Sequence, residues 1–599
     1  MLKKVKLEGS FEGIELRGIS YRYPHREQDS LYEINCRIGK GRMIAVLGAG
    51  GSGKSTLALM LNGLIPQFME GDLRGSMLLD GQDTGEYSVP TLAHHVGLVF
   101  QDGEAQIFSR QVGADVAFGP RNYGFSPQET EERVQTALAA AGLAGMEERN
   151  TAELSGGEKQ RLAVAGILAI APEFMVLDEA LAELDAQGRQ GLYRQLEQLR
   201  CQRGTTVITI EKNLEELMSL DEGEDEEAVQ ENLLDEVVVL KDGCLIFQGR
   251  PEDFLPNIPL VREAGVKPLP VCLLGWELYR RGQIPLTDIP ITLSAARGLL
   301  SRLAAEGGDT LDFRRKEKGA VSVKTEGEVI LRTENLAYYY EREKRLALQG
   351  IDLSLRRGEF IALVGVNGSG KTTLAKHFNG LLKGKEGTVY LNGTDVKEMR
   401  PEDLFRQVGY VFQNPDHQIF ASKVEDEISY GLKNMGLTLA EKEKRMEEVL
   451  ALTGLTDCRT KHPHMLSKGR RQMVALASVL VLKPEVLVID EPTTGLDWPG
   501  VTQVMGMVQE LHKQGTTVVM VSHDMDIVAH YAERVVVMKE GRCLAAESTG
   551  AFFSDPGLWE RAGLCFPQSE KLAAWLGRNC ARPGEWAKEL RWLMFEGEQ

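Results

Sequence analysis

Short apolar runs, each followed by glycines or by acidic residues, recur along the chain and predict buried strands. Residues 44–47 and 361–364 are aliphatic and rich in β-branched side chains, and each run leads through glycines into a segment of helix-forming composition. Residues 174–177 and 486–489 are apolar throughout and precede a pair of acidic residues. Uninterrupted apolar runs of this length are typical of parallel strands that are covered on both faces. The pattern therefore predicts an α/β fold.

The same series of motifs occurs twice, which predicts two homologous halves in tandem. We expect the first half to span 1–325 and the second 326–599, each ending in a helical tail, with the join in the charged stretch 314–328. The first half also carries an acidic insertion at 219–236, which favours a solvated loop, although a docking site for a basic partner stays open. The repeated motifs are GAGGSGKST at 48–56 and GVNGSGKTT at 365–373, VGLVFQ at 96–101 and VGYVFQ at 408–413, and LSGGEKQ at 154–160 and LSKGRRQ at 466–472.

The pattern GxxxxGK[ST] lies between the predicted strand and helix of each half. Its glycines let backbone N–H groups converge on phosphate oxygens, and the helix N-terminus adds positive potential. The lysine then reaches the β- and γ-phosphates, and the next hydroxyl is offered to Mg²⁺. The sequence therefore predicts two sites for ATP and Mg²⁺. The expected nucleotide contacts are Gly48, Gly51, Ser52, Gly53, Lys54, Ser55 and Thr56 in the first half and Gly365, Asn367, Gly368, Ser369, Gly370, Lys371, Thr372 and Thr373 in the second.

An acidic pair follows each apolar run, as Asp178-Glu179 and Asp490-Glu491. The carboxyl ends of parallel strands are where α/β sheets bind ligands, and a buried carboxylate is costly without a cation nearby. We expect the first acid of each pair, with Ser55 or Thr372, to hold Mg²⁺. The second acid, Glu179 or Glu491, is suited to orient or deprotonate the attacking water.

A further motif, LSGGEKQR at 154–161, resembles the signature of ATP-binding-cassette (ABC) ATPases. Ser155 stands where a helix N-cap would be, so that its hydroxyl, the glycines and the helix dipole can face the γ-phosphate of a nucleotide held by another domain. The resemblance implies two tandem P-loop cassettes, each with a RecA-like core, an antiparallel β subdomain and a helical signature subdomain. It also implies that the two cassettes close head to tail around two ATP molecules. The signature contacts that it implies are Ser155, Gly156, Gly157, Ser467 and Gly469.

The resemblance extends to individual residues. Gln101 and Gln413 match the glutamine loop, which senses Mg²⁺ and faces a transmembrane partner. Tyr23 and Tyr340 are candidates for stacking on adenine, although an aromatic residue on a strand can equally serve packing alone. The pairs that match the loop crossing the cassette interface are Leu184-Asp185 and Leu496-Asp497.

A narrower resemblance comes from QNPDHQIF at 413–420, which looks like a stretch of the energy-coupling factor (ECF) transporter ATPases, importers of vitamins and transition-metal ions. The first half keeps the stretch loosely as QDGEAQIF at 101–108. The resemblance implies a motor on the cytoplasmic face of the cell membrane, bound to an integral membrane T component and through it to a substrate-binding S component. Two alternatives stay open: a soluble tandem-cassette ATPase that acts on ribosomes or nucleic acid, and a tandem sugar-importer ATPase.

The two halves differ at the positions where members of this family contact the γ-phosphate. His523 matches the switch histidine, whereas Lys212 stands at the equivalent position of the first half. Lys468 takes the place of Gly156 in the second signature, and its side chain fills room that glycine leaves for phosphate. In a head-to-tail pair both substitutions fall on the same site, the one with Glu179. We therefore expect the site with Glu491 to turn over ATP and the other to bind it with slow or no hydrolysis, unless the substitutions are neutral.

Composition narrows the classes of function. The 599 residues carry a net charge of -18 at a pI of about 5.3, which argues against a general nucleic-acid binder. The apolar segment at 269–276 is too short to span a membrane, and the N-terminus lacks the apolar core of a signal peptide, so any membrane role is expected to act through partners. Eight cysteines without a CxxC pair favour neither a disulfide framework nor a zinc or iron–sulfur site.

Overall fold

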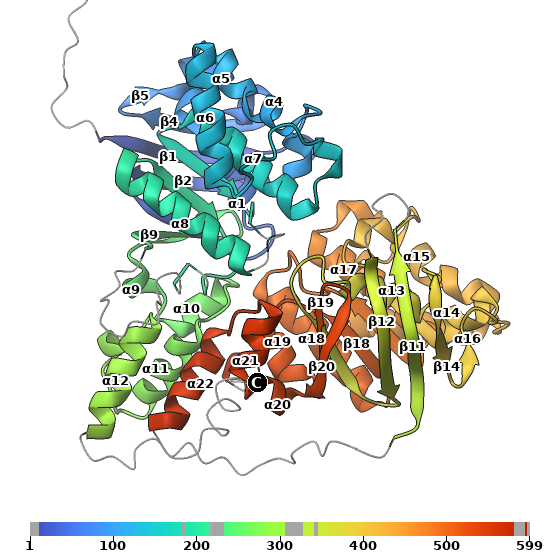
Figure 1. The fold of residues 1–599 in the computed structure, drawn as a ribbon. Helices are drawn as coiled ribbons and strands as arrows, with labels where there is room; N and C mark the ends of the chain where they lie inside the picture. Colours follow the sequence, from blue (N-terminus) through green and yellow to red (C-terminus); the bar gives the residue numbers. More distant parts are fainter. Residues whose placement is uncertain are drawn as a thin grey trace, which may run out of the picture. The chain divides into compact units, whose positions relative to one another are not determined.

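The computed structural model of the chain describes residues 11–181, 184, 186–215, 217–218, 233–305, 327–340, 346–579 and 593–595. The chain divides into two compact units, Met1–Ser301 and Arg302–Gln599, coloured blue to green and green to red in Figure 1. The join predicted near residue 325 falls among residues 306–326, outside the described part of the chain.

Each unit is built around a six-stranded sheet with the same strand order. The strands are parallel except for one edge strand, which forms an antiparallel hairpin with its neighbour. The runs predicted as buried strands are fully buried, which confirms the α/β prediction. In the first unit the order is β10(Cys244–Gly249), β9(Glu236–Lys241), β3(Met43–Leu47), β8(Thr206–Ile210), β7(Phe174–Asp178) and β6(Val96–Val99). In the second it is β20(Arg542–Ser548), β19(Arg534–Lys539), β13(Phe360–Val364), β18(Thr517–Val521), β17(Val486–Asp490) and β16(Val408–Val411).

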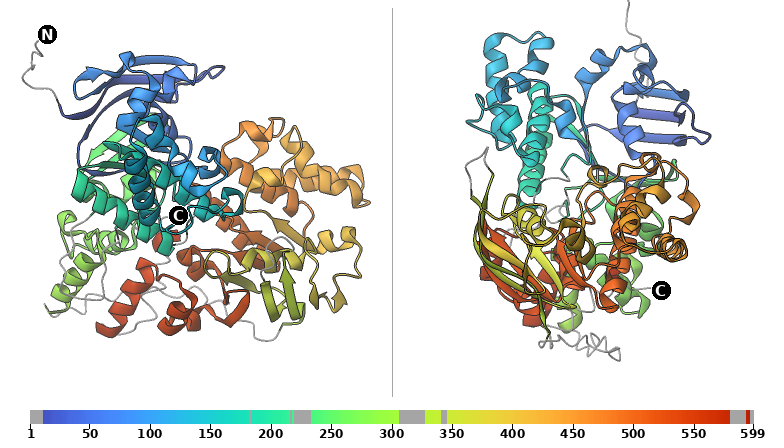
Figure 2. Two further views of the ribbon diagram at one scale, coloured as in Figure 1. Left: turned by 45° about the horizontal axis from the view of Figure 1, so that its top comes forward. Right: turned by 90° about the vertical axis from the view of Figure 1, so that its right-hand side faces the viewer.

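A four-stranded antiparallel sheet and a group of helices complete each unit, as the ABC resemblance implies. In Figure 2 the antiparallel strands and the helical part of the first unit are seen as separate lobes. The antiparallel sheets are β2(Leu31–Gly39), β1(Gly13–Arg22), β4(Asp72–Leu79), β5(Gln82–Asp83), and β12(Leu346–Arg356), β11(Val329–Tyr339), β14(Glu386–Leu391), β15(Thr394–Asp395). The helices are α4(Val112–Val116), α5(Phe118–Asn122), α6(Pro127–Ala140), α7(Gly156–Ile170), and α15(Val424–Tyr430), α16(Leu439–Thr453), α17(Lys468–Leu480).

Helices also follow the last strand of each core. Those of the first unit are α9(Pro251–Phe254), α10(Ile258–Glu263), α11(Pro270–Arg280) and α12(Leu293–Ala305), and those of the second are α20(Thr549–Phe553), α21(Pro556–Ala562) and α22(Gln568–Asn579). No helix among the described residues is long and apolar enough to cross a membrane.

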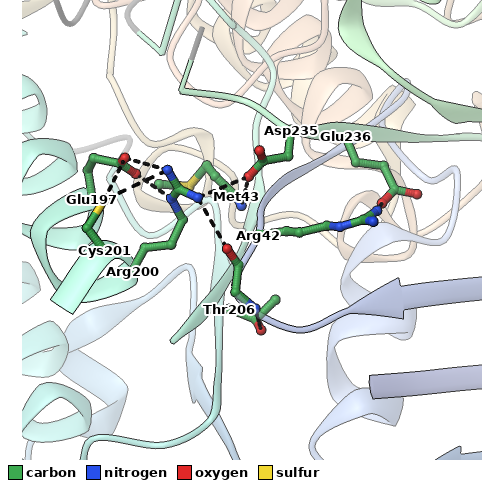
Figure 3. A network of polar contacts seen from close by, with 9 residues as sticks. Arg42, Met43, Glu197, Arg200, Cys201, Thr206, Asp235 and Glu236 are labelled. Atoms are coloured by element: carbon green, nitrogen blue, oxygen red, sulfur yellow. Dashed lines mark hydrogen bonds and ion pairs between the residues drawn. The ribbon is translucent and has the colours of Figure 1, made fainter. Parts of the chain in front are cut away.

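A polar network anchors β9, the strand that follows the acidic segment (Figure 3). Asp235 accepts a hydrogen bond from the backbone of Met43 at 2.8 Å, and Glu236 pairs with Arg42 at 2.8 Å. Arg200, on α8(Ala186–Arg203), pairs with Glu197 at 2.6 Å and reaches Asp235 at 3.5 Å. The last two residues of the predicted insertion 219–236 are therefore fixed to the amino ends of the central strands, while 219–232 lie outside the described residues.

Candidate functional site

Two phosphate loops connect β3 to α1(Lys54–Leu61) and β13 to α13(Lys371–Phe378). Glycine is required at the start of each loop, where φ is +145° at Gly48 and +150° at Gly365. A Cβ atom at Gly48 would lie 2.1 Å from the carbonyl oxygen of Leu240, and one at Gly365 would lie 2.2 Å from that of Met538. The loops can therefore turn only with a bare backbone, which leaves their N–H groups accessible to an anion.

The loop lysines are buried beneath these turns. Lys54 Nζ donates to the carbonyl oxygens of Gly48 and Ala49, both at 2.7 Å. Lys371 Nζ donates in the same way to Gly365 at 2.7 Å and to Val366 at 3.0 Å. A buried ammonium group is stable only where anionic or carbonyl oxygens surround it, so each loop holds a positive charge in position for phosphate.

The two tyrosines proposed to meet adenine lie beside the phosphate loops. The hydroxyl of Tyr23 is 3.2 Å from Oγ1 of Thr56, and that of Tyr340 is 3.3 Å from Oγ1 of Thr373. Each ring also makes an edge contact with a second tyrosine of its strand region, so packing and base stacking are both compatible with this geometry.

In the second unit, the strand acids and the glutamine form one hydrogen-bonded group. Glu491 accepts hydrogen bonds from Gln413 at 2.8 Å and from Thr494 at 3.1 Å, and its second oxygen lies 3.5 Å from Nδ1 of His523. Burial raises the pKa of Glu491, but His523, Lys371 and Thr494 together outweigh burial and lower it. The carboxylate is therefore ionised and oriented, as an acceptor for a water proton must be.

Asp490 lies next to this group and has two donors. Thr372 donates to one oxygen at 3.0 Å, and Tyr410 donates to the other at 2.9 Å. Burial is the largest effect on Asp490 and raises its pKa. Tyr410 was not among the predicted site residues, although a position-by-position comparison of VGLVFQ with VGYVFQ points to it.

The first unit brings the equivalent residues together with different partners. Glu179 pairs with Lys212 Nζ at 2.6 Å and accepts a hydrogen bond from Gln101 at 3.1 Å. Asp178 accepts a hydrogen bond from Ser55, while its Oδ1 is buried with no hydrogen-bond partner among the described residues. Burial raises the pKa of Asp178 to about 6. Here Leu98 takes the place of Tyr410 and supplies no donor.

A further carboxylate of the first unit also escaped prediction. Glu211 accepts hydrogen bonds from Tyr193 at 2.5 Å and from Thr209 at 2.9 Å. Burial raises the pKa of Glu211 to about 7, and the nearby charge of Glu179 adds to the rise. The second unit has Ser522 at the equivalent position, while its Asp524 stands where the first unit has Asn213, so the acidic group of this segment lies at a different position in each unit.

Both glutamates share one backbone feature, since φ is +48° at Glu179 and at Glu491. A side chain rarely adopts this left-handed conformation without strain, and such residues concentrate at functional sites. In this conformation each glutamate contacts the glutamine and the switch residue of its own unit.

The signature helices differ at their N-termini. Ser155 caps α7, and Glu158 returns a bond to its backbone at 2.7 Å, which completes a capping box. Ser467 caps α17 without this return bond, because Arg470 stands in place of the glutamate and pairs with Asp457 at 2.7 Å. Lys468 turns back within its own unit, with Nζ against Gly495. The residues predicted for the loop at the cassette interface are described in part. In the second unit Asp497 caps α18(Trp498–Lys513). In the first unit Leu184 is buried, and Asp185 lies outside the described residues.

ATP with Mg²⁺ fits these residues. The bare-backbone loops and buried lysines suit phosphate. The oxygen of Asp178 that has no partner in the described part of the chain lies on a residue bonded to Ser55, and it suits a hard cation that prefers oxygen ligands. The same set of residue types occurs twice in the chain, once in each unit.

Comparison with known proteins agrees with this chemistry. The ABC transporter family matches residues 31–182 and 348–494. A relative from Caldanaerobacter subterraneus, assigned as an ABC transporter ATP-binding protein, is 37% identical, with 88% of this chain and 90% of the relative covered. A relative of the same description from Methanosarcina acetivorans is 36% identical, with 94% and 90% covered.

Among solved structures, CbiO1 from Clostridium perfringens, described as part of the ABC transporter complex CbiONQ, is 38% identical. The match covers 42% of this chain and 100% of that chain, with a TM-score of 0.36. The sequence relatives, which match over most of both chains, decide the family. The chain belongs to the ATP-binding proteins of ABC transporters, and it is an ATP hydrolase that carries two cassettes in one polypeptide.

Proposed function

We propose that this chain is the motor of an ECF-type importer for a vitamin or a transition-metal ion. In this role it acts on the cytoplasmic face of the membrane, bound to a T component that in turn holds an S component. The observation that carries the proposal is the segment after each glutamine, which has the ECF-like sequence and presents an aromatic pair to solvent.

The second glutamine of the segment supports the loop in both units, through one equivalent hydrogen bond and a second one whose acceptor differs. The side chain of Gln106 accepts from the backbone N–H of Phe100 at 2.8 Å and donates to Leu98 at 3.0 Å. Gln418 accepts from the N–H of Phe412 at 3.3 Å and donates to Ala475 at 2.7 Å. The second glutamine of QxxxxQIF therefore fixes the conformation of the loop. A loop of fixed conformation supports a role in holding a partner in a defined position.

In both units this glutamine is followed by an isoleucine and then by a solvent-exposed phenylalanine. Phe108 is 57% exposed and contacts Phe118 with 4.1 Å between ring centroids. Phe420 is 64% exposed and contacts Tyr430 with 4.7 Å between centroids. Exposed aromatic pairs at equivalent positions are typical of surfaces that bind protein partners, and two of them suit two helices of one membrane subunit.

An ion pair connects this loop to the signature helix in each unit. Glu104 meets Lys159 on α7 at 2.6 Å, and Asp416 meets Arg471 on α17 at 2.8 Å. A partner that moves the loop would therefore also move the helix whose N-terminus is proposed to face ATP. This connection supports coupling between the membrane partner and the nucleotide sites.

In the proposed cycle the two cassettes pair head to tail, each nucleotide lying between one phosphate loop and the signature of the other unit. ATP favours the closed pair, and hydrolysis returns the population to the open pair. Mg²⁺, when bound with ATP, neutralises charge that develops on the phosphates. Glu491 takes a proton from the attacking water. Gln413 orients the carboxylate of Glu491, His523 contacts the γ-phosphate, and Lys371 binds the phosphates.

We also propose that the two sites work unequally. In the first unit the ammonium group of Lys212 forms an ion pair with Glu179 at 2.6 Å. The corresponding contact in the second unit is longer, since the imidazole of His523 lies 3.5 Å from the carboxylate of Glu491. A carboxylate held in a close ion pair is less available to a water molecule. The first site would therefore hold ATP, and the second would hydrolyse it.

The transport role is tested by purifying the tagged chain from its own cells in mild detergent and identifying its partners by mass spectrometry. We expect one polytopic membrane protein and a small, very hydrophobic one, and both should be lost from a Phe108→Asp/Phe420→Asp variant. Leu439→Asp, at another exposed apolar residue, serves as the control and should retain them. Recovery of ribosomal proteins or of sugar-permease subunits instead would contradict the proposal.

A further inference from the structure

The segment that follows the switch residue carries a buried acid in both units. Glu215 lies three residues after Lys212, and Asp526 lies three residues after His523. Glu215 is 8% exposed and Asp526 is 2% exposed. A buried carboxylate is costly unless polar groups meet it, so an acid that is buried at the same place in both units calls for a partner there.

In each unit a partner of this acid comes from the helical tail. Lys267, just before α11, is buried, and its Nζ lies 3.6 Å from the carboxylate of Glu215. Ser569, in the first turn of α22, is fully buried, and its hydroxyl donates to Oδ1 of Asp526 at 2.6 Å. One contact is an ion pair and the other is a hydrogen bond from a neutral group. Both tails nevertheless meet the same position of the core, so the two units share a contact between tail and acid.

In the second unit the acid belongs to the first turn of α19(Met525–Tyr531), the helix that follows the switch residue. Asp524 caps this helix and accepts from the backbone N–H of Asp526 at 3.0 Å. Three positions separate Asp526 from His523, which is less than one helical turn. A shift of the acid therefore also moves His523, whose Nδ1 lies 3.5 Å from the carboxylate of Glu491.

Aromatic contacts hold the tail of the second unit in place. Phe566, three residues before Ser569, stacks on Trp559 with 4.0 Å between ring centroids. Nε1 of Trp559 donates to the carbonyl oxygen of Phe552 at 2.9 Å. These rings pack in the same hydrophobic core as the buried side chains of α19 (Figure 1). A hydrogen bond from a segment fixed in this way can hold the helix that it meets in one position.

We propose that Ser569 is a positioning residue for ATP hydrolysis. Its hydrogen bond to Asp526 holds the first turn of α19 and thereby keeps His523 next to Glu491. The ion pair between tail and acid in the first unit corresponds to this bond. The inference rests on the proposed assignment of hydrolysis to the site with Glu491, and it is independent of the proposed transport role.

The test compares Ser569→Ala with Thr549→Val in the full chain. Thr549 is a buried residue of the same tail and donates to the carbonyl oxygen of Ala532 at 2.6 Å, at the end of α19 that is remote from the switch residue. Each variant loses one buried hydrogen bond between tail and α19, so each should lower the melting temperature by about 2–4 °C. Only Ser569→Ala should lower the turnover rate, at least about fivefold, while the KM for ATP changes less than about twofold.

Two further measurements support this comparison. Ser569→Cys replaces the hydroxyl with a weaker donor of similar shape, so its turnover should fall in the same direction but by less. Hydrogen exchange followed by mass spectrometry reports on the switch segment without depending on turnover. Residues 522–527 should exchange at least about threefold faster in Ser569→Ala than in the wild-type chain, and Thr549→Val should leave the exchange of this segment unchanged.

Either of two results would overturn the proposal. One is a turnover rate of Ser569→Ala equal to that of Thr549→Val in a chain whose turnover depends on Glu491. The other is exchange of residues 522–527 that the loss of the hydroxyl leaves unchanged. Glu491→Gln, assayed beside these variants, separates this inference from the assignment on which it rests. If Glu491→Gln keeps most of the turnover, that assignment has failed, and the exchange of residues 522–527 then decides whether Ser569 positions the switch residue.

Discussion

At the residue scale, the two units differ most clearly in what surrounds the aspartate at the end of the central strand. Asp490 has two donors, Thr372 and Tyr410. In the first unit Leu98 stands in place of the tyrosine, and Asp178 keeps a buried oxygen without a partner among the described residues. An extra donor fixes the orientation of a buried carboxylate and offsets part of the cost of burying it. Tyr410 is thus a positioning residue for Asp490.

We predict that Tyr410→Phe destabilises the second unit by about 1–2 kcal/mol, because Asp490 loses a donor while remaining buried. ATP hydrolysis should fall several-fold, and the Mg²⁺ dependence of ATP binding should shift to higher Mg²⁺. Denaturant unfolding and titration with ATP at several Mg²⁺ concentrations would measure both effects. Tyr390→Phe, which removes a hydroxyl from β14 of the same unit, is the control. Unchanged stability and Mg²⁺ dependence in Tyr410→Phe would show that the hydrogen bond is unimportant.

The ion pair between Lys212 and Glu179 leads to a second prediction at this scale. Lys212→His replaces the 2.6 Å ion pair with the imidazole that the second unit uses. In a Glu491→Gln background, the combination with Lys468→Gly should raise the remaining ATPase activity at least about tenfold, as expected when a general base becomes available. Steady-state phosphate release measures this gain. If the activity stays at the level of Glu491→Gln alone, the first site is limited by something other than these two lysines.

These contacts show what could and could not be predicted from the sequence. The types of residue at the two sites follow from the repeated motifs, and the buried strands follow from uninterrupted apolar runs. The pairing of Tyr410 with Asp490 joins residues 80 positions apart, and that of Tyr193 with Glu211 depends on how α8 packs on the sheet. No local pattern contains such contacts. Comparison of the two halves was the one signal that could have identified Tyr410.

At the scale of elements, an ion pair connects the loop after each glutamine to the signature helix of the same unit. Their connecting ion pairs, Glu104–Lys159 and Asp416–Arg471, are partly exposed and therefore contribute less than about 1 kcal/mol to stability. In the proposed mechanism these ion pairs transmit motion from the loop to the signature helix. The N-cap of the signature helix was predictable from Ser155, but this link between two segments about 55 residues apart was not.

We predict that Asp416→Asn leaves thermal stability and ATP affinity nearly unchanged but lowers the stimulation of ATPase activity by the proposed membrane partner several-fold. The reason is that Arg471 loses its charged link to the loop. The charge-reversed pair Asp416→Arg/Arg471→Asp should recover part of the stimulation. Equal loss in the single and the reversed variants would indicate that Asp416 contacts the partner directly and does not act through α17.

At the scale of the whole molecule, one polypeptide carries two homologous cassettes, which differ at several positions of the two candidate sites. Lys212, Lys468 and Leu98 distinguish them, and so does Glu211. In the proposed head-to-tail pairing, the changes at 98, 211, 212 and 468 all fall on the site with Lys54. A fused chain keeps one such site and one consensus site in every molecule, which two separate identical subunits could not do. The net charge of -18 also favours a protein partner over nucleic acid.

The most direct test of this account is steady-state ATP hydrolysis by Glu491→Gln and by Glu179→Gln, each measured on the full chain together with ATP binding. Glutamine keeps the shape of the side chain and removes its ability to accept a proton. We predict that Glu491→Gln lowers the turnover rate at least about 100-fold and that Glu179→Gln retains about half or more of it, with two ATP molecules bound in both. Comparable losses from the two substitutions would contradict the division of labour between the sites.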